Sequence, residues 1–516
     1  NGSGSITINN PINTAGITSV TLGSGNFVAG STAGDSIVSG GDNNTLVGTN
    51  AGTAITTGDR NTALGVDALN DVTTASYNTA IGTYAGQNIT TGATNTAIGD
   101  AALASTTTAS DNTAVGQGSL NANITGASNT AVGRNALTTN TTGASNVAIG
   151  AAALDANTTG TSNVSLGANS LTANTTASSN TAIGTDTLYA NTTGAENVAV
   201  GQGALSANTT AAYNVGVGRN ALAANTTGAS NVAVGAFSLD ANTTGTGNIS
   251  IGVGALGSNT TASEGTGVGD GCLTANTTGA LNSAFGAQTL AVCTTGGSNT
   301  AIGGYALNDA TTGFHNTAVG VNTLAVVTTG GSNTAFGYNA GAGITNGSNN
   351  LLLGNGAGNA GSPSGGLTQQ DHLMCLGNNS ITAAYIKVAW TVTSDQRDKA
   401  DITDFTHGLD YINGLRPVNY VWDDRSNYAD GISDGSKKKD LPQLGFLAQD
   451  IEAVETSLGI TNNCVVDKED VDNLKITETK LIPILVNAIK ELSAKNDALE
   501  TQNATFAARL TALEGV

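Results

Sequence analysis

The stretch Asn129–Ser145, NTAVGRNALTTNTTGAS, decides the fold, because close variants of it follow one another without interruption. Asn recurs every 17 residues from Asn44 to Asn350, and Gly265 is the single exception among the 19 positions. A Gly follows each of these positions four residues later, and a large apolar residue precedes that Gly. Leu stands eight residues after the Asn position in 15 of the 19 units. A fixed period of this kind indicates a repeat architecture.

The length of the unit selects the kind of repeat. Seventeen residues are too few for a pair of helices and do not match a heptad, but they suit one coil of a parallel β-solenoid. Each coil would hold a short T-A-V-G strand, a turn, a segment carrying the Leu, and a T-T-G turn, with Gly where positive φ or close backbone approach is needed. We therefore predict a mainly β protein with a solenoid over residues 44–358, roughly 90 Å long at about 4.8 Å per coil.

Stacking of identical coils predicts two further features. A second Asn repeats from Asn123 to Asn276, and we expect its side chains to form an amide ladder from coil to coil. Within each strand, Thr and Val should point to one side and Ala and Gly to the other. Neither side is charged, so a single rod would leave an apolar stripe in water, which is typical of an interface. We expect a parallel homotrimer; the alternative is a monomeric solenoid.

Composition limits the classes of partner. The chain has 70 Gly, 10% charged residues and a net charge of −20. Residues 1–393 hold 15 acids and 4 bases, and residues 394–516 hold 22 acids and 13 bases, so neither part suits nucleic acid or an anionic membrane. There is no run of 18 apolar residues, which argues against membrane insertion. The four Cys lack metal-ligand spacing, so we expect unpaired small hydrophobes, with no metal and no cofactor. They are Cys272, Cys293, Cys375 and Cys464.

The character of the chain changes at Ser394. Residues 1–43 are a β-rich lead-in, and residues 359–393 are a stem in which ITAAYIKVAWTV suggests two short strands. After Ser394 the repeat ends, and charge, Pro and long apolar side chains enter. HGLDYINGL has helical spacing, RPVNYVW alternates as a strand does, QLGFLAQDIEAV leads into a helix, and NNCVVDKED and DNLKITETK flank a hairpin-like region. These features predict a small α+β domain over residues 394–516.

The last element is a long helix from about Thr479 to Glu514 that carries a heptad pattern. Asn at an a position fixes the register and oligomeric state of a coiled coil. The pattern is therefore a second indication of self-association. The trimerisation residues that we predict are Ile489, Asn496, Asn503 and Leu510 at a, and Leu492, Leu499, Phe506 and Leu513 at d; Leu485 is a further d position of the heptad.

The ordered pieces SDQRDK, LDYINGLRPVNYVW, GFLAQDIEAV and LIPILVNAIKELSAKNDALE resemble the intramolecular chaperone domain at the C-terminus of phage tailspikes and tail fibres, the endosialidase type. The resemblance implies a domain that trimerises, guides folding of the upstream fibre and then cuts itself off. It implies Ser394 as nucleophile, Lys399 as base and Thr393–Ser394 as the bond cut. Asp395 and Arg397 match the remaining motif positions. An uncleaved trimerisation foot with the same fold is the alternative.

The chemistry of the junction can also be considered without the resemblance. A Ser hydroxyl needs a base, and Lys serves when desolvation or a nearby cation favours its neutral form. Arg397 could supply that cation or could orient a carboxylate. Residues five apart share neither a strand face nor a helix face, so a turn must bring Lys399 to Ser394. The chain has three His, which leaves a Ser-His-Asp triad possible but without a supporting motif: His315, His372 and His407.

The motif N-T-A-[VI]-G-x-x-A-L resembles the head repeats of trimeric autotransporter adhesins and the solenoid parts of phage fibres. We therefore expect an extracellular, structural and receptor-binding virion fibre, whose partners are a host-surface receptor such as a glycan and other virion proteins. The chain begins at Asn1 without a signal pattern, so an N-terminal anchor is expected to be missing. The alternatives are a fibre-borne glycan depolymerase and a bacterial surface adhesin. No activity on an external substrate is expected, because the acids of the solenoid form no clustered pair.

Overall fold

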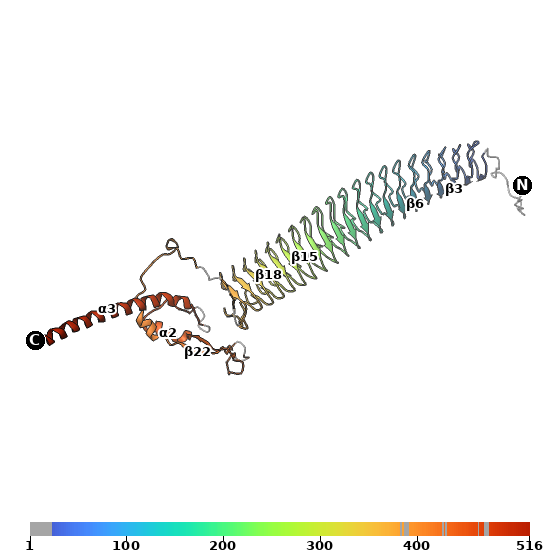
Figure 1. The fold of residues 1–516 in the computed structure, drawn as a ribbon. Helices are drawn as coiled ribbons and strands as arrows, with labels where there is room; N and C mark the ends of the chain where they lie inside the picture. The colour runs from blue at the N-terminus through green and yellow to red at the C-terminus, as the bar shows by residue number, and fades with distance from the viewer. Residues whose placement is uncertain are drawn as a thin grey trace. The chain divides into compact units, whose positions relative to one another are not determined.

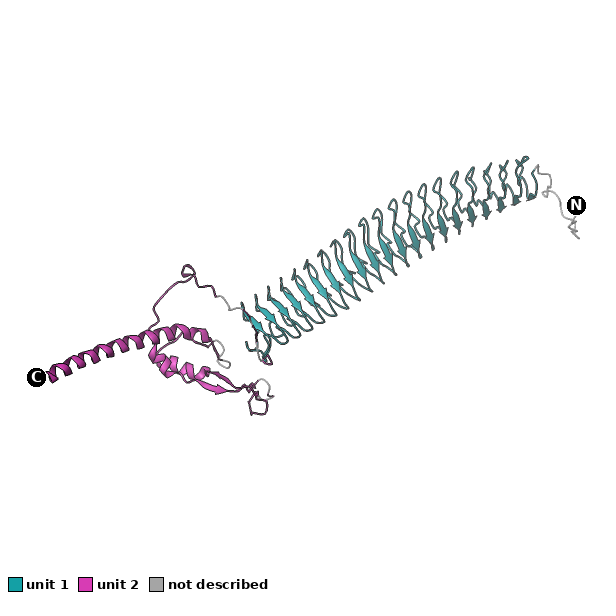
Figure 2. Cartoon of the chain, in the orientation of Figure 1, with its two compact units in different colours: residues 1–378 teal, residues 379–516 magenta. Residues whose placement is uncertain are grey.

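The computed structural model describes residues 23–515, except 382–383, 386, 388–391, 426–427, 429–430, 463 and 469–473. Two compact units, residues 1–378 and residues 379–516, make up the chain, and each is described by itself (Figure 2). The SITI segment of the predicted lead-in lies outside the described residues, as does most of GITSVTLGSG. Among the described residues, no helix combines the length and the apolarity that crossing a membrane requires.

The first unit is a stack of three-residue strands (Figure 1). The strands are β1 Phe27–Ala29, β2 Thr45–Val47, β3 Thr62–Leu64, β4 Thr79–Ile81, β5 Thr96–Ile98, β6 Thr113–Val115, β7 Thr130–Val132, β8 Val147–Ile149, β9 Val164–Leu166, β10 Thr181–Ile183, β11 Val198–Val200, β12 Val215–Val217, β13 Val232–Val234, β14 Ile249–Ile251, β15 Thr266–Val268, β16 Ser283–Phe285, β17 Thr300–Ile302, β18 Thr317–Val319, β19 Thr334–Phe336, β20 Leu351–Leu353 and β21 Met374–Leu376.

Every strand pairs in parallel with the next strand along the chain, in one 21-stranded sheet. Thr62 pairs with Thr79, for example, and Thr79 with Thr96, so equivalent residues of successive coils lie above one another. The parallel β-solenoid with 17-residue coils is thereby confirmed. The stack includes one more coil at each end than residues 44–358, because β1 pairs with β2 and β20 pairs with β21.

The Gly that stands four residues after each repeated Asn position forms a column along the stack, here called the Gly column. Its presence follows from a close approach of the backbones of successive coils. Gly150 has φ of +141°, and a Cβ built on it would lie 2.4 Å from the carbonyl oxygen of Gly167 in the next coil. Gly167 has the same relation to Gly184, at 2.3 Å. Any side chain at this position would collide with the neighbouring coil and would need a backbone conformation that L-residues avoid. The unbroken Gly register is thus a packing requirement of the stack.

The interior of the coil is built from small and branched apolar side chains. The middle residue of each strand is buried, as Ala131 and Ala148 show, and so is the Leu of each unit, such as Leu137. These Leu residues have positive φ, 52° at Leu137, a conformation that costs a non-Gly residue about 1 kcal/mol or more. Complete burial of the isobutyl group, worth roughly 1.5–3 kcal/mol, offsets this cost. The sequence did not reveal the left-handed conformation.

Two Asn ladders run along the solenoid. The predicted ladder is present: Asn140 Nδ2 donates to Asn123 Oδ1 at 2.8 Å, and Asn157 Nδ2 donates to Asn140 Oδ1 at 2.8 Å. A second ladder, which sequence reasoning missed, is formed by the Asn that begins each repeat. Asn163 shows its pattern: its side chain is fully buried, and its Nδ2 donates to Asn146 Oδ1 at 3.2 Å. Both ladders satisfy most of their buried polar groups, which would otherwise be costly. Asn214 Nδ2 and Asn276 Oδ1 are exceptions without a hydrogen-bond partner among the described residues.

The outer face of the sheet carries the first and third residues of each strand. Thr or Val occupies the first position in most of these strands, and Val, Ile, Leu or Phe occupies the third position in all but β1, which ends at Ala29. Several third-position side chains are exposed, including Ile149, Ile251, Phe285 and Phe336. The expected alternation, with Ala inward and Thr and Val outward, is therefore observed, and it leaves an apolar stripe on the outside of the sheet.

The second unit combines short strands with three helices. Its elements are η1 Gln396–Asp398, α1 Leu409–Gly414, β22 Val418–Tyr420, β23 Gln443–Gly445, α2 Ala448–Ser457, β24 Val466–Asp467, β25 Lys475–Ile476, η3 Glu478–Lys480 and α3 Leu481–Glu514. β22 pairs antiparallel with β23, and β24 pairs antiparallel with β25. These elements match the predicted helices, strand and hairpin. Most of ITAAYIKVAWTV lies outside the described residues.

Candidate functional site

The junction folds around a single 3-10 turn, η1. Asp395 is its N-cap, and the side chain of Asp395 accepts a hydrogen bond from the Arg397 N–H at 2.9 Å. Asp is among the residues that cap helices best, because its carboxylate satisfies an unpaired N–H of the first turn. The Lys399 N–H donates to Gln396 O at 3.1 Å and ends the turn. The sequence SDQRDK thus folds into one tight turn within six residues.

The turn brings Lys399 to Ser394. Lys399 Nζ lies 2.6 Å from Ser394 Oγ, a hydrogen-bond distance, although the residues are five apart. This is the contact that a Ser–Lys pair requires, because the base must reach the proton that it removes. The roles of Ser394 as nucleophile and Lys399 as base, and cleavage of Thr393–Ser394, stay predictions.

Arg397 pairs with Asp395 rather than standing alone. Arg397 Nη2 lies 2.7 Å from Asp395 Oδ2, and Arg397 Nε donates to Asp395 Oδ1 at 3.1 Å. The side-chain hydrogen bond from Arg397 lowers the pKa of Asp395, and the same bond raises the pKa of Arg397. Of the two roles considered for Arg397, the geometry matches orientation of a carboxylate. Both side chains face water, so this pair shapes the turn more than it stabilises the fold.

The junction is open to solvent in the single chain. Thr393, Ser394, Arg397 and Lys399 are all exposed. A lysine base works best where water is excluded, because a dry environment disfavours its charged form. Such an environment would have to come from further packing around the junction.

A buried carboxylate, which sequence reasoning missed, fixes the core of the second unit. Glu455 on α2 is fully buried and accepts hydrogen bonds from Tyr411 Oη at 3.0 Å and from the Val465 N–H at 2.7 Å. Lys468 Nζ lies 3.5 Å from its other oxygen. Desolvation and then the bond to Glu455 raise the pKa of Tyr411. These contacts join α1, α2 and β24, and no local pattern distinguishes Glu455 from a surface residue of α2.

The predicted trimerisation residues form a stripe on α3. Leu481, Ile484 and Ala488 at the start of the helix are buried against its own unit. The side chains at the a and d positions of the heptad are instead exposed in the single chain. They are Leu485, Ile489, Leu492, Asn496, Leu499, Asn503, Phe506, Leu510 and Leu513. A stripe of this kind is typical of a helix that packs against other helices.

Other candidate chemistry receives less support from the geometry. His407 Nδ1 lies 2.6 Å from Asp410 Oδ2, and no serine hydroxyl among the described residues bonds to that ring. The part of the chain that the structure describes holds no cluster of three potential metal ligands. The four Cys are unpaired, as expected. Burial raises the pKa of Cys272 to about 12 and that of Cys293 to about 11, which disfavours thiolate chemistry.

Comparison with known proteins identifies a family match within the second unit. No curated protein and no solved structure matches the chain. Residues 394–460 match the peptidase S74 family, chaperone of endosialidase. The matched segment begins at Ser394, the residue that Lys399 contacts, and includes η1, α1, β22, β23 and α2. Residues 394–460 are therefore a chaperone-of-endosialidase domain, and in this chain the domain follows a parallel β-solenoid.

Proposed function

We propose that this chain is a trimeric, receptor-binding fibre whose C-terminal domain aligns three copies, guides stacking of the coils and then cuts itself off before Ser394. The family match supports a role in trimerisation and folding for a fibre-like protein. The observation that carries the cleavage proposal is the 2.6 Å contact between Lys399 Nζ and Ser394 Oγ at the start of that domain. Arg397 and Asp395 hold the turn that creates this contact.

The cleavage step that we propose uses this contact. Ser394 Oγ attacks the carbonyl carbon of Thr393 while neutral Lys399 accepts the hydroxyl proton. The C–N bond between Thr393 and Ser394 then breaks, and the amine of Ser394 takes up a proton. The product is an ester between the Thr393 acyl group and Ser394 Oγ. Water hydrolyses this ester, which leaves a carboxylate at Thr393 and a free N-terminus at Ser394.

Association of three chains would precede this step. The apolar stripe on the solenoid sheet and the exposed heptad stripe on α3 both favour association of identical chains. Parallel stacking of β-strands is slow and exposes unpaired, aggregation-prone strand edges during folding. A C-terminal domain that holds three chains in register would therefore assist folding of the solenoid. Removal of this domain afterwards would leave a rod that cannot readily refold and is therefore kinetically trapped. We place the mature rod on a virion, with a bacterial cell surface as the alternative, and we take its receptor to be a host-surface molecule such as a glycan.

The experiment is mass determination of purified protein under denaturing conditions. The unmodified chain should yield a fragment that begins at Ser394, whereas Ser394→Ala and Lys399→Ala should each leave a full-length chain of 50.7 kDa. Ser457→Ala and Lys490→Ala, at exposed positions of α2 and α3, are the matched controls and should cleave normally. A correctly assembled wild-type trimer that stays intact would remove the cleavage role and leave the assembly role. Cutting of the Ser394→Ala chain at the same bond would assign the work to an outside protease.

A further inference from the structure

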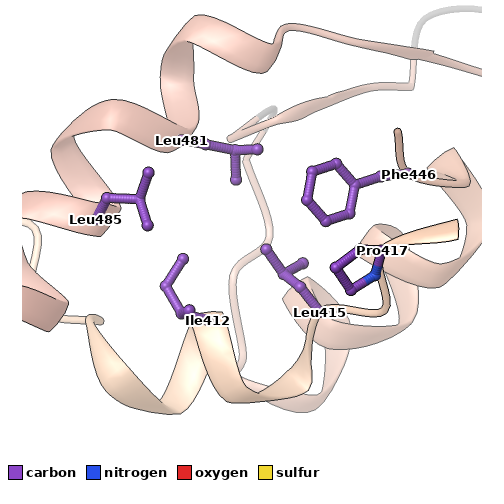
Figure 3. A pocket seen from close by; sticks show the side chains of 6 residues that line it. All are labelled: Ile412, Leu415, Pro417, Phe446, Leu481 and Leu485. Atoms are coloured by element: carbon purple, nitrogen blue, oxygen red, sulfur yellow. The ribbon is translucent and has the colours of Figure 1, made fainter. Parts of the chain in front are cut away.

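An apolar pocket lies beside the first turns of α3 (Figure 3). Its volume is about 190 Å³, and its walls come from α1, from the segments that follow α1 and β23, and from α3. No polar side chain lines it. The lining residues are Ile412, Leu415, Pro417, Phe446, Leu481 and Leu485. An apolar pocket that is open to water is typical of an interaction site.

The heptad register of α3 relates this pocket to the face on which a second helix would pack. With Leu485 at d, Leu481 takes a g position, and both residues line the pocket. Ala488, the next g residue, is buried against its own unit. The g flank of α3 is thus covered by α1 and the pocket wall of the same chain.

On the opposite flank, the first turns of α3 are apolar and uncovered. Val486 takes the e position, and 46% of its surface is exposed. Ile482 and Ile489, at a, are 59% and 65% exposed. An apolar residue at e is unusual for a coiled coil, in which e and g are commonly charged. Val486 therefore lacks in the single chain the packing partner that its chemistry favours.

We propose that the pocket of one chain receives Val486 of a second copy when the α3 helices associate in parallel. In a parallel coiled coil the e flank of one helix faces the g flank of its neighbour, and the pocket lies on the g flank. A branched aliphatic side chain suits the size and apolar lining of the pocket. Around a three-fold axis, each chain would give one Val486 and offer one pocket, so all three contacts close.

This contact rests on the proposed trimer and adds to it a physical link to the junction. Val486 of one copy would press on Leu415 and Phe446 of the next, which belong to the domain that begins at Ser394. The helices alone could associate without ordering that domain. With the pocket filled, association of α3 also packs α1 and the segment before α2, so trimerisation and completion of the domain become one event.

The test measures trimer dissociation of the full chain by light scattering over a dilution series. To keep the chain uncleaved, all variants carry Ser394→Ala. Val486→Ser changes a side chain that is exposed in the single chain, so the isolated fold should survive, and the dissociation constant should rise at least tenfold. Leu415→Ala in the pocket should raise it similarly, with circular dichroism confirming that the unit stays folded. The double variant should show less than the product of the two effects, because both changes remove the same contact.

The control pairs Val486→Ser with Leu510→Ala, about 36 Å further along the helix, and those two effects should multiply. If the effects of Val486→Ser and Leu415→Ala on the dissociation constant multiply in the double variant, the pocket contact is refuted. An unchanged dissociation constant for Val486→Ser while Leu492→Asp still separates the chains would also refute it; in both cases the trimer itself stands. A Ser394→Ala parent chain that is monomeric at every concentration would instead refute the trimer, and the pocket contact with it.

Discussion

Replacement of Asn163 by Ala should open the solenoid locally, because this side chain makes three buried hydrogen bonds. Asn163 Nδ2 donates to Asn146 Oδ1 at 3.2 Å and to Ala177 O at 2.9 Å, and Asn163 Oδ1 accepts from the Asn180 N–H at 3.0 Å. At about 1 kcal/mol for each bond, and more where a buried donor such as the Asn180 N–H is left unpaired, the cost is about 3 kcal/mol. Each 1.4 kcal/mol is a factor of ten, so the local opening equilibrium should rise roughly a hundredfold.

Native-state hydrogen exchange measures this quantity directly, because amides of the coils on either side of residue 163 exchange through local opening. Peptides that cover these coils should exchange roughly a hundredfold faster in the variant, whereas peptides from coils near residue 300 should be unchanged. Thr161→Ala, two residues away on the exposed surface, is the matched control, and its effect should stay within about 0.5 kcal/mol.

Gly265 offers the same test in reverse. The ladder lacks a side chain there, so the carbonyl that would accept the Asn282 N–H is missing. Gly265→Asn should slow exchange in the neighbouring coils, although its Cβ would lie 3.1 Å from Asn248 Oδ1 and requires a small adjustment. If Asn163→Ala behaves like Thr161→Ala, or if Gly265→Asn accelerates exchange, the ladder does not stabilise the stack as argued.

Three other changes test separate features. Gly150→Ala should destabilise the solenoid by at least about 2 kcal/mol, because its Cβ would lie 2.4 Å from Gly167 O. The loss should appear as a lower denaturation midpoint, and an unchanged midpoint would contradict the packing role of the Gly column. Asp155 has a buried Oδ1 without a hydrogen-bond partner, and desolvation raises its pKa above the ordinary 3.8, so its cost to stability is absent below about pH 3.8 and grows as the pH rises. Asp155→Asn should therefore raise the thermal midpoint at pH 7 but not at pH 3. The new side-chain amide would donate a hydrogen bond in the way that Asn121 Nδ2 donates to Ala101 O at 3.0 Å. An equal gain at both pH values would argue against this account. Asn496→Ile together with Asn503→Ile should raise the thermal midpoint of α3 and broaden the distribution of oligomers in light scattering, because polar a residues select one register; a single unchanged oligomer would show that register is set elsewhere.

The sequence predicted the coil, its period and one ladder because those features repeat at fixed offsets. It did not predict the ladder that runs through Asn44, because an Asn before a strand also suits a turn, and only stacking shows that its side chain is buried. The positive φ of Leu137 was equally hidden, since packing overrides the local preference of Leu. The coils that hold β1 and β21 lie where the 17-residue period lapses, so periodicity could not reveal them.

At the junction, the residue types and the need for a turn between Ser394 and Lys399 were predicted, but the residue that caps the turn was not. Spacing alone left Ser394 and Lys399 unconnected, and the cap formed by Asp395 supplied the turn that joins them. Glu455 could not have been identified, because a single acid on an amphipathic helix usually faces solvent. Its burial depends on Tyr411, which precedes it by 44 residues.

The direction of the strand pairing has a mechanical consequence. The hydrogen bonds between coils, such as Thr62 N–H to Asn78 O at 2.8 Å, run along the stack and not across it. A pull applied to the two ends of the stack would load these bonds one coil at a time, so the coils would peel away in sequence instead of failing together. Each released coil of 17 residues would lengthen the chain by roughly 50 Å, the extended length less one coil spacing. Such a rod would absorb work in many small steps.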